Sequence, residues 1–226
     1  MQVTKTNARF LSASALVILV GIVLSGPVAV VLVELFVPQP AWHDAATFIQ
    51  HYSWLQALTY VFGFLILGGC VAFMAGLIST AHENQRPLAF TAFGFTCVAA
   101  AMVFTNYVLQ TGYIPQALDG DPGILAMLTM ANPRSFAWAL EMYGYGIFGV
   151  ASLFAAPIFD NQGRQRVIRI LFIVNGVASI VAAFLVPLIP GWLLTVLGLT
   201  AGAAWNILLI TLMAIVIREF RFGRGR

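Results

Sequence analysis

The chain has 226 residues, of which 61% are hydrophobic and only 8% are charged. A soluble domain carries about 25% charged residues, so the composition excludes an ordinary water-soluble globule, a disordered tail and a nucleic-acid-binding domain. The net charge is +3, and the two cysteines are too few for a disulfide scaffold. The composition therefore predicts an integral membrane protein, with the lipid bilayer as its first partner and no nucleic acid.

Six apolar stretches are long enough to cross a bilayer, which takes about 20 residues in a helix. Continuous apolar runs, such as residues 207–217, favour helices over the alternating strands of a membrane β-barrel. Too few residues remain between the stretches for a separate soluble domain. We expect an all-α protein with a single six-helix transmembrane domain over residues 1–226, its spans at 10–37, 54–80, 88–111, 136–159, 167–188 and 191–217.

The N-terminus allows two interpretations. Lys5 and Arg9 followed by the apolar residues 11–24 resemble the charged and apolar regions of a signal peptide. Apolar sequence continues through residues 28–33, however, beyond any plausible cleavage site near Ser25. This continuation favours an uncleaved first span.

The basic residues are sorted by position along the chain. When six spans are threaded through a membrane, ten of the eleven lysines and arginines fall on the side of the termini, and Arg134 falls on the other. Cytoplasmic loops are enriched in Lys and Arg. We therefore expect both termini in the cytoplasm and a location in a cell membrane, of the bacterial cytoplasmic (inner membrane) type.

Two outer loops, residues 38–53 and 112–135, are longer than the others. Asp44 is placed to cap a short helix over 45–52, and Asp121 followed by proline is placed to cap another over 124–131. Asn132 and Pro133 repeat this signal before the fourth span. The two short interfacial helices either form a lid over the outer face or rest in the headgroup layer.

Proline and glycine mark the expected irregularities and contacts of the spans. Pro27 predicts a kink in the first span, because proline removes a backbone hydrogen bond and clashes with the preceding turn. Closely spaced glycines let helices approach each other. Internal packing is the expected role of Gly63, Gly68, Gly69, Gly144, Gly146, Gly149, Gly198 and Gly202, with a homodimer face or a partner membrane subunit as the alternative.

Several kinds of chemistry lack the residues that they need. All three histidines lie in predicted loops, so the paired intramembrane histidines of a haem site are missing. Lys5 is the only lysine, so no retinal-type Schiff base can form inside the bundle. The sequence has no hydrolase, zincin or Walker motif. His43, Asp44 and His51 are a weak metal-binding pattern that loop solvation explains better. We expect no metal and no cofactor, and catalytic residues stay unassigned.

One glutamate lies well inside a predicted span. Glu141 is about 7.5 Å below the outer boundary of the fourth span, at 1.5 Å per residue. An ionised carboxylate costs about 2–3 kcal/mol in lipid, so such groups face the bundle interior and are usually functional. Residues three, four and seven positions apart share a helix face. Arg134, Trp138 and Tyr145 therefore lie on the face of Glu141.

Other spans supply polar groups at a matching depth, so we expect an outward-facing polar pocket with Glu141 at its floor. The predicted ligand-binding residues are Glu141, Arg134, Asn106, Tyr107, Gln110, Glu34, Tyr145 and Trp138. The alternative is a hydrogen-bond network, from Glu141 to Asn106 or Tyr107, that only fixes helix packing. Deeper in the membrane, Asn175 and Asn206 are expected to hydrogen-bond to each other.

Three function classes remain. The first is a protein that binds or transports a lipid-like or small polar solute. The second is a membrane-embedded enzyme, with Glu141 as acid or base, Arg134 as an anion clamp, and Glu34, His51 or Tyr145 as a second group. The third is a non-catalytic accessory subunit of a membrane complex. The absence of a recognisable catalytic motif favours the first over the second. Residues 132–146 are dense in special residue types, but we assign them to no family.

Overall fold

The computed structural model describes residues 3–189 and 191–222. Helices, turns and loops make up this part of the chain, and it contains no strand. Within it, six helical stretches are long and apolar enough to cross a membrane. The expected all-α class and six spans are therefore confirmed. Pro190, in the predicted turn between spans five and six, and the basic residues Arg224 and Arg226 lie outside the described residues.

The first span has three helical parts, and each of the others is built on one α-helix. The spans are α1 (Lys5–Val23), η1 (Leu24–Val28) and α2 (Ala29–Phe36), then α4 (Leu58–Ile78), α5 (Arg86–Val108), α7 (Phe136–Ala155), α8 (Gly163–Leu188) and α9 (Val196–Phe222). Two short helices connect them, α3 (Ala45–Gln50) and α6 (Pro122–Leu128). Single turns flank these helices, at η2 (Trp54–Ala57), η3 (Glu83–Gln85), η4 (Leu109–Tyr113), η5 (Ile114–Gln116), η6 (Ala156–Ile158) and η7 (Trp192–Leu194).

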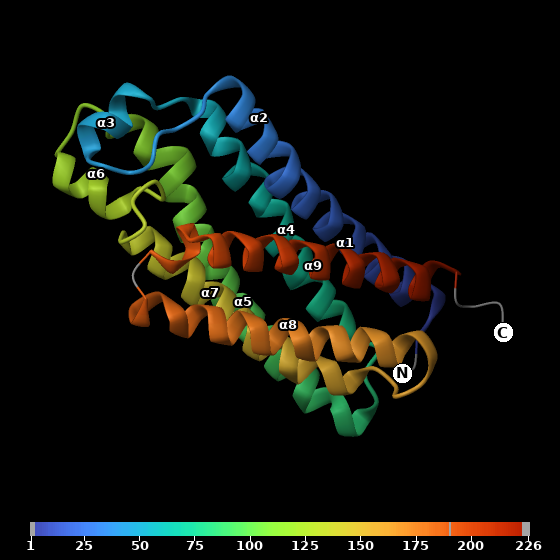
Figure 1. The fold of residues 1–226 in the computed structure, drawn as a ribbon. Helices are drawn as coiled ribbons and strands as arrows, with labels where there is room; N and C mark the ends of the chain where they lie inside the picture. The colour runs from blue at the N-terminus through green and yellow to red at the C-terminus, as the bar shows by residue number, and fades with distance from the viewer. Residues whose placement is uncertain (1–2, 190, 223–226) are drawn as a thin grey trace.

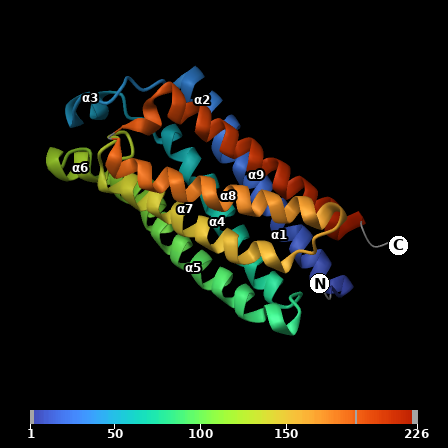
Figure 2. The same ribbon diagram turned by 60° about the horizontal axis from the view of Figure 1, so that its bottom comes forward.

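The six spans form a closed ring in chain order. Each span packs against the next, and α9 returns to pack against α1 (Figures 1 and 2). The expected neighbours α4 and α5, α7 and α8, and α8 and α9 are all in contact. We call the end of the bundle that carries α3 and α6 the loop end. The opposite end, where α1 begins and α9 ends, is the basic end (Figure 1).

The helices extend beyond the predicted spans at the basic end. The fifth span begins at Gly163 rather than 167, and the sixth ends at Phe222 rather than 217. A hydropathy window stops at charged residues, but a helix need not, because arginine side chains at its end reach water. The sixth span also starts later than predicted. Gly191 takes a left-handed conformation, with φ 74°, before the turn that leads into α9.

The predicted interruption of the first span is a π-helical turn. Pro27 lies inside η1, where the regular α-helical hydrogen-bond pattern is broken. The hydroxyl of Ser25 donates to the backbone carbonyl of Thr59 on α4, at 2.8 Å. This bond fastens the irregular turn to the neighbouring span.

Several glycines lie where two helices approach too closely for a side chain. A Cβ at Gly144 would lie 2.5 Å from Val103, and one at Gly149 would lie 2.7 Å from the carbonyl of Gly176. Gly68 and Gly202 have no atom within 4 Å of that position among the described residues. Internal packing therefore explains some of the predicted contact glycines but not all of them.

The loop-end helices have the predicted capping residues, but α3 ends at Gln50 rather than 52, and α6 covers Pro122–Leu128 rather than 124–131. The carboxylate of Asp44 accepts a hydrogen bond from the backbone N–H of Thr47 at the start of α3. The carboxylate of Asp121 accepts from two backbone N–H groups at the start of α6. The prediction that Asn132 and Pro133 start the fourth span is wrong. Ser135 caps α7 instead, by accepting from the N–H of Trp138.

Candidate functional site

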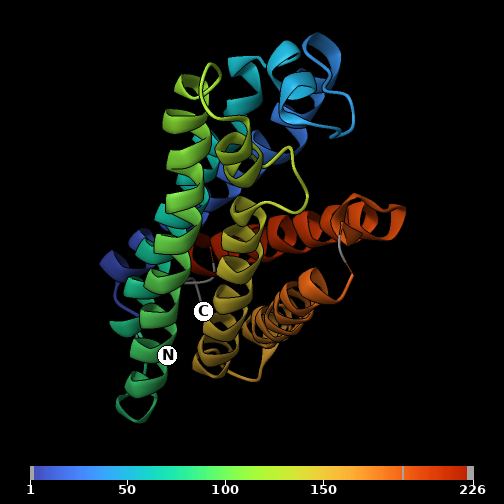
Figure 3. The ribbon, with the colours of Figure 1, turned by 90° about the vertical axis from the view of Figure 1, so that its left-hand side faces the viewer.

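Glu141 joins α7 to α5 through two hydrogen bonds. The Nδ2 of Asn106 donates to its Oε2 at 2.8 Å, and the hydroxyl of Tyr107 donates to its Oε1 at 3.1 Å. These two helices lie side by side along the bundle (Figure 3). The network proposed from the sequence thus exists, with both of the suggested partners. A carboxylate accepts about four hydrogen bonds, so this one has room for further partners.

The network continues to the loop end through Gln110. Its Nε2 donates to Oδ1 of Asn106 at 3.1 Å and to the carbonyl of Leu128 at 2.8 Å. Its Oε1 accepts from the N–H of Met130 at 3.0 Å. Trp138 anchors the same loop, since its Nε1 donates to the carbonyl of Met130 at 2.7 Å. The backbone after α6 is therefore fixed to the side chains around Glu141.

Tyr145 lies between Tyr107 and α9. Its hydroxyl is 3.0 Å from that of Tyr107, and either hydroxyl can be the donor of the hydrogen bond between them. The ring of Tyr145 packs edge-on against Trp205, with ring centroids 5.1 Å apart. Tyr145 therefore connects the carboxylate network to the indole of α9.

A cavity of about 240 Å³ lies beside this network, between α7, α8 and α9. Glu141 and Tyr145 line it, together with three indoles and a wall of small side chains. The lining residues are Trp138, Glu141, Met142, Tyr145, Ala178, Ser179, Ala182, Trp192, Ala201, Gly202 and Trp205. Ala178, Ala201 and Gly202 are exposed on the sides of α8 and α9. We infer that the mouth of the cavity is on the side of the bundle, between these two helices.

The three indoles of the cavity differ in how their N–H groups are bonded. Trp138 donates to Met130, and Trp205 donates to Oδ1 of Asn175 at 2.9 Å and to the hydroxyl of Ser179 at 3.3 Å. The Nε1 of Trp192 is buried and has no hydrogen-bond partner among the described residues. A buried donor without a partner costs about 1–3 kcal/mol, so an acceptor atom in the cavity would stabilise this arrangement.

The prediction that Asn175 and Asn206 hydrogen-bond to each other is wrong. Asn175 is fully buried and bonds to Trp205 and, at 2.9 Å, to the hydroxyl of Ser152 on α7. Asn206 donates back to the carbonyl of Gly202 on its own helix. Matching depth on neighbouring spans did not bring the two amides together, because Asn175 faces Ser152 of α7 whereas Asn206 lies against Gly26 of η1.

Two predicted site residues lie apart from Glu141. Glu34 is exposed on α2, which packs against α4 and η2, and it has no polar partner among the described residues. Arg134 is also exposed, in the turn before α7, and its backbone N–H donates to the side chain of Asn132. The expected convergence therefore includes Asn106, Tyr107, Gln110, Tyr145 and Trp138, but neither Glu34 nor the Arg134 side chain.

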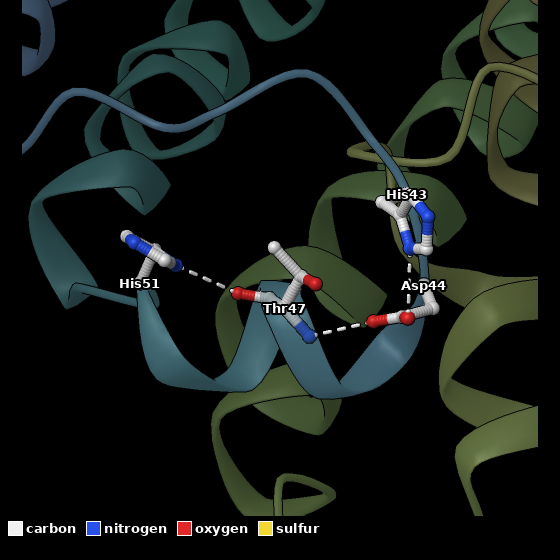
Figure 4. A network of polar contacts seen from close by, with 4 residues as sticks. All are labelled: His43, Asp44, Thr47 and His51. Atoms are coloured by element: carbon white, nitrogen blue, oxygen red, sulfur yellow. Dashed lines mark hydrogen bonds and ion pairs between the residues drawn. The ribbon is translucent and has the colours of Figure 1, made fainter.

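His43, Asp44 and His51 bond to their own loop (Figure 4). The Nδ1 of His43 donates to Asp44 at 2.8 Å, and the Nδ1 of His51 donates to the carbonyl of Thr47 at 2.9 Å. The backbone N–H of Thr47 and the ring of His43 hold the pKa of Asp44 at about 2, so this carboxylate caps α3 as an anion. Within the described ranges, no three metal-ligating side chains are grouped to hold an ion.

Sequence reasoning missed Trp192 and Trp205 as neighbours of Glu141. Both belong to the last span and its preceding turn, more than 50 residues further along the chain. The one sequence signal for Trp192 was its position at the predicted outer end of the sixth span, where tryptophans are common. Only the closure of the helix ring brings the indoles of this segment to α7.

Comparisons with protein-family models, with curated proteins and with solved structures found no match to this chain.

Proposed function

We propose that the chain binds a lipid-like or small polar solute in the cavity between α7, α8 and α9, and that the bound group is cationic. The observation that carries this proposal is a carboxylate in the wall of an aromatic cavity within the membrane-spanning part of the chain. Intramembrane carboxylates usually mark substrate or ion pathways.

The charge of Glu141 favours a cationic ligand. Its partners among the described residues are the neutral side chains of Asn106 and Tyr107. Arg134, in the turn before α7, is exposed and is not bonded to Glu141. A cation in the cavity would supply the missing countercharge.

The aromatic lining of the cavity also favours a cationic ligand. Cations are attracted to the faces of indole and phenol rings, and groups of such rings recognise quaternary ammonium ligands. Trp138, Trp192, Trp205 and Tyr145 all line the cavity. The unpartnered Nε1 of Trp192 supports a ligand that also carries an acceptor oxygen near its cation.

The position of the cavity supports entry from the bilayer. Small exposed residues of α8 and α9 line it, and the flanking surface of α8 is apolar, with Val177 and Val181 each 52% exposed. A lipid-like molecule would reach the cavity sideways. We also propose that the basic end faces the cytoplasm of a bacterial cell, because it carries most of the lysines and arginines.

Binding of benzyltrimethylammonium tests this proposal. Three of the five tryptophans line the cavity, so tryptophan fluorescence of the detergent-solubilised protein reports occupancy. We expect a saturable change with the cation and none with neopentylbenzene, its uncharged isostere. Glu141→Gln keeps an acceptor for Asn106 or Tyr107 but removes the charge. It should weaken binding roughly tenfold, or about 1.4 kcal/mol.

Glu83→Gln is the matched control. It removes the same negative charge, and Glu83 is exposed at the basic end, away from the cavity. Its affinity should equal that of the unmodified chain. Equal binding of the cation and its isostere would overturn the proposal. So would an unchanged affinity in Glu141→Gln that retains its melting temperature.

A further inference from the structure

A second cavity lies at the basic end, between the start of α1 and the end of α9. It is a groove of about 700 Å³ that includes Lys5, Arg9 and Arg221 among its lining residues. No Asp or Glu belongs to the described residues that line it. The groove is separate from the cavity of Glu141, with which it shares no lining residue.

The acidic residue closest in sequence points to another helix. Glu219 is two positions from Arg221 on α9, and residues two apart lie on different faces of a helix. Its carboxylate is 3.8 Å from Nε of Arg164 and accepts a hydrogen bond from Gln165, both on α8. The carboxylate of Glu219 is therefore directed toward α8 and does not line the groove.

The basic side chains of α1 continue into an apolar stripe. Lys5, Arg9, Ser12, Leu16 and Val20 follow one another at intervals of three or four residues, so they share one face of α1. Lys5 and Arg9 are exposed, and neither makes an ion pair with another described residue. Leu16 and Val20 are 47% and 42% exposed. One side of the helix thus presents cations at its end and apolar surface further into the membrane.

We propose that this groove binds a phospholipid with an anionic headgroup. The phosphate would lie between Lys5 and Arg9 of α1 and Arg221 of α9, and the acyl chains would follow Leu16 and Val20. Basic pockets between transmembrane helices bind anionic headgroups in this way. The lipid would bridge the first and last spans, where the ring of helices closes.

Native mass spectrometry of the detergent-solubilised protein tests the proposal. The protein is titrated with dioleoylphosphatidylglycerol, with the zwitterionic dioleoylphosphatidylcholine, and with dioleoylglycerol, which has the same tails and no phosphate. We expect phosphatidylglycerol to be retained most. Lys5→Gln with Arg9→Gln should weaken its binding by about fivefold for each side chain, which corresponds to about 1 kcal/mol each.

The control is Arg166→Gln, because Arg166 is exposed at the same end and does not line the groove. It removes one positive charge, as each of the two groove substitutions does, and should keep the preference for phosphatidylglycerol. Equal retention of the three lipids would overturn the proposal. A double variant that melts like the unmodified chain and retains as much phosphatidylglycerol would overturn it as well.

Discussion

Individual polar side chains hold α5 and α7 in register. Glu141 accepts from two side chains of α5, and Asn106 accepts in turn from Gln110, so each amide is both donor and acceptor. Buried amides and carboxylates are costly in a membrane unless they are bonded in this way. The same bonds fix the carboxylate at the wall of the cavity, so helix packing and a binding role are compatible.

Asn106→Ala should destabilise the protein by about 1 kcal/mol, which is typical of an interhelical hydrogen bond in a membrane. The substitution removes a donor to Glu141 and an acceptor of Gln110. The midpoint of unfolding in a titration with sodium dodecyl sulfate measures the change. Thr105→Ala is the control, because that hydroxyl is exposed and bonds within its own helix. Equal losses in the two variants would argue against an interhelical network.

At the scale of whole helices, close approach depends on which glycine faces a neighbour. α4 carries Gly63, Gly68 and Gly69, which are indistinguishable by residue type. Gly63 faces the ring of Tyr107, Gly69 faces Ile18, and Gly68 faces open space among the described residues. The fourth glycine of α4, Gly76, faces Leu11 of α1, so three of its four glycines face a neighbouring helix and one does not.

Gly63→Ala should destabilise the fold by about 1–3 kcal/mol, as overpacking of a filled site does. The new methyl group would overlap the ring of Tyr107 and displace its hydroxyl from Glu141. Gly68→Ala adds the same methyl group where nothing lies within 4 Å, so it should cost nothing. Thermal unfolding measures both. A Gly68→Ala loss as large as that of Gly63→Ala would contradict the packing seen here.

The whole molecule has two chemically different ends. The loop end holds α3 and α6, which pack on each other through a small apolar cluster of their own that includes Phe48 and Leu125. The basic end holds the arginines of α8 and α9, of which Arg164 pairs with Glu219. This sorting of charge supports a fixed orientation in the membrane.

Cysteine labelling should report that orientation. His43→Cys places a thiol at the loop end, and Asn161→Cys places one in the exposed turn before α8. A membrane-impermeant maleimide applied to intact cells should label the first and not the second, and permeabilised cells should show both. The native Cys70 is buried and Cys97 is partly buried within the spans, so background should be low. The reverse labelling pattern would place the termini outside.

Much of the local structure could be predicted from the sequence, because its causes are local. Long apolar runs predict the spans, and the caps of α3 and α6 follow from an aspartate beside the first helical turn. The span ends at the basic end were less predictable, since hydropathy falls at arginines while the helix continues. The first residue of α7 agrees with the predicted span, but its capping residue was misassigned, because Asn132 and Ser135 are both good capping residues and only one of them takes that position.

The sequence by itself determined that the chain is a bundle of six apolar helices with one glutamate, Glu141, well inside a span. The tertiary structure decided what surrounds that glutamate. It joined Glu141 to Asn106 and Tyr107, left Glu34 exposed, and closed the ring so that Trp192 and Trp205 line the same cavity. Helix formation depends on neighbours three or four residues apart. Which faces of distant helices meet depends instead on side-chain packing around the whole ring.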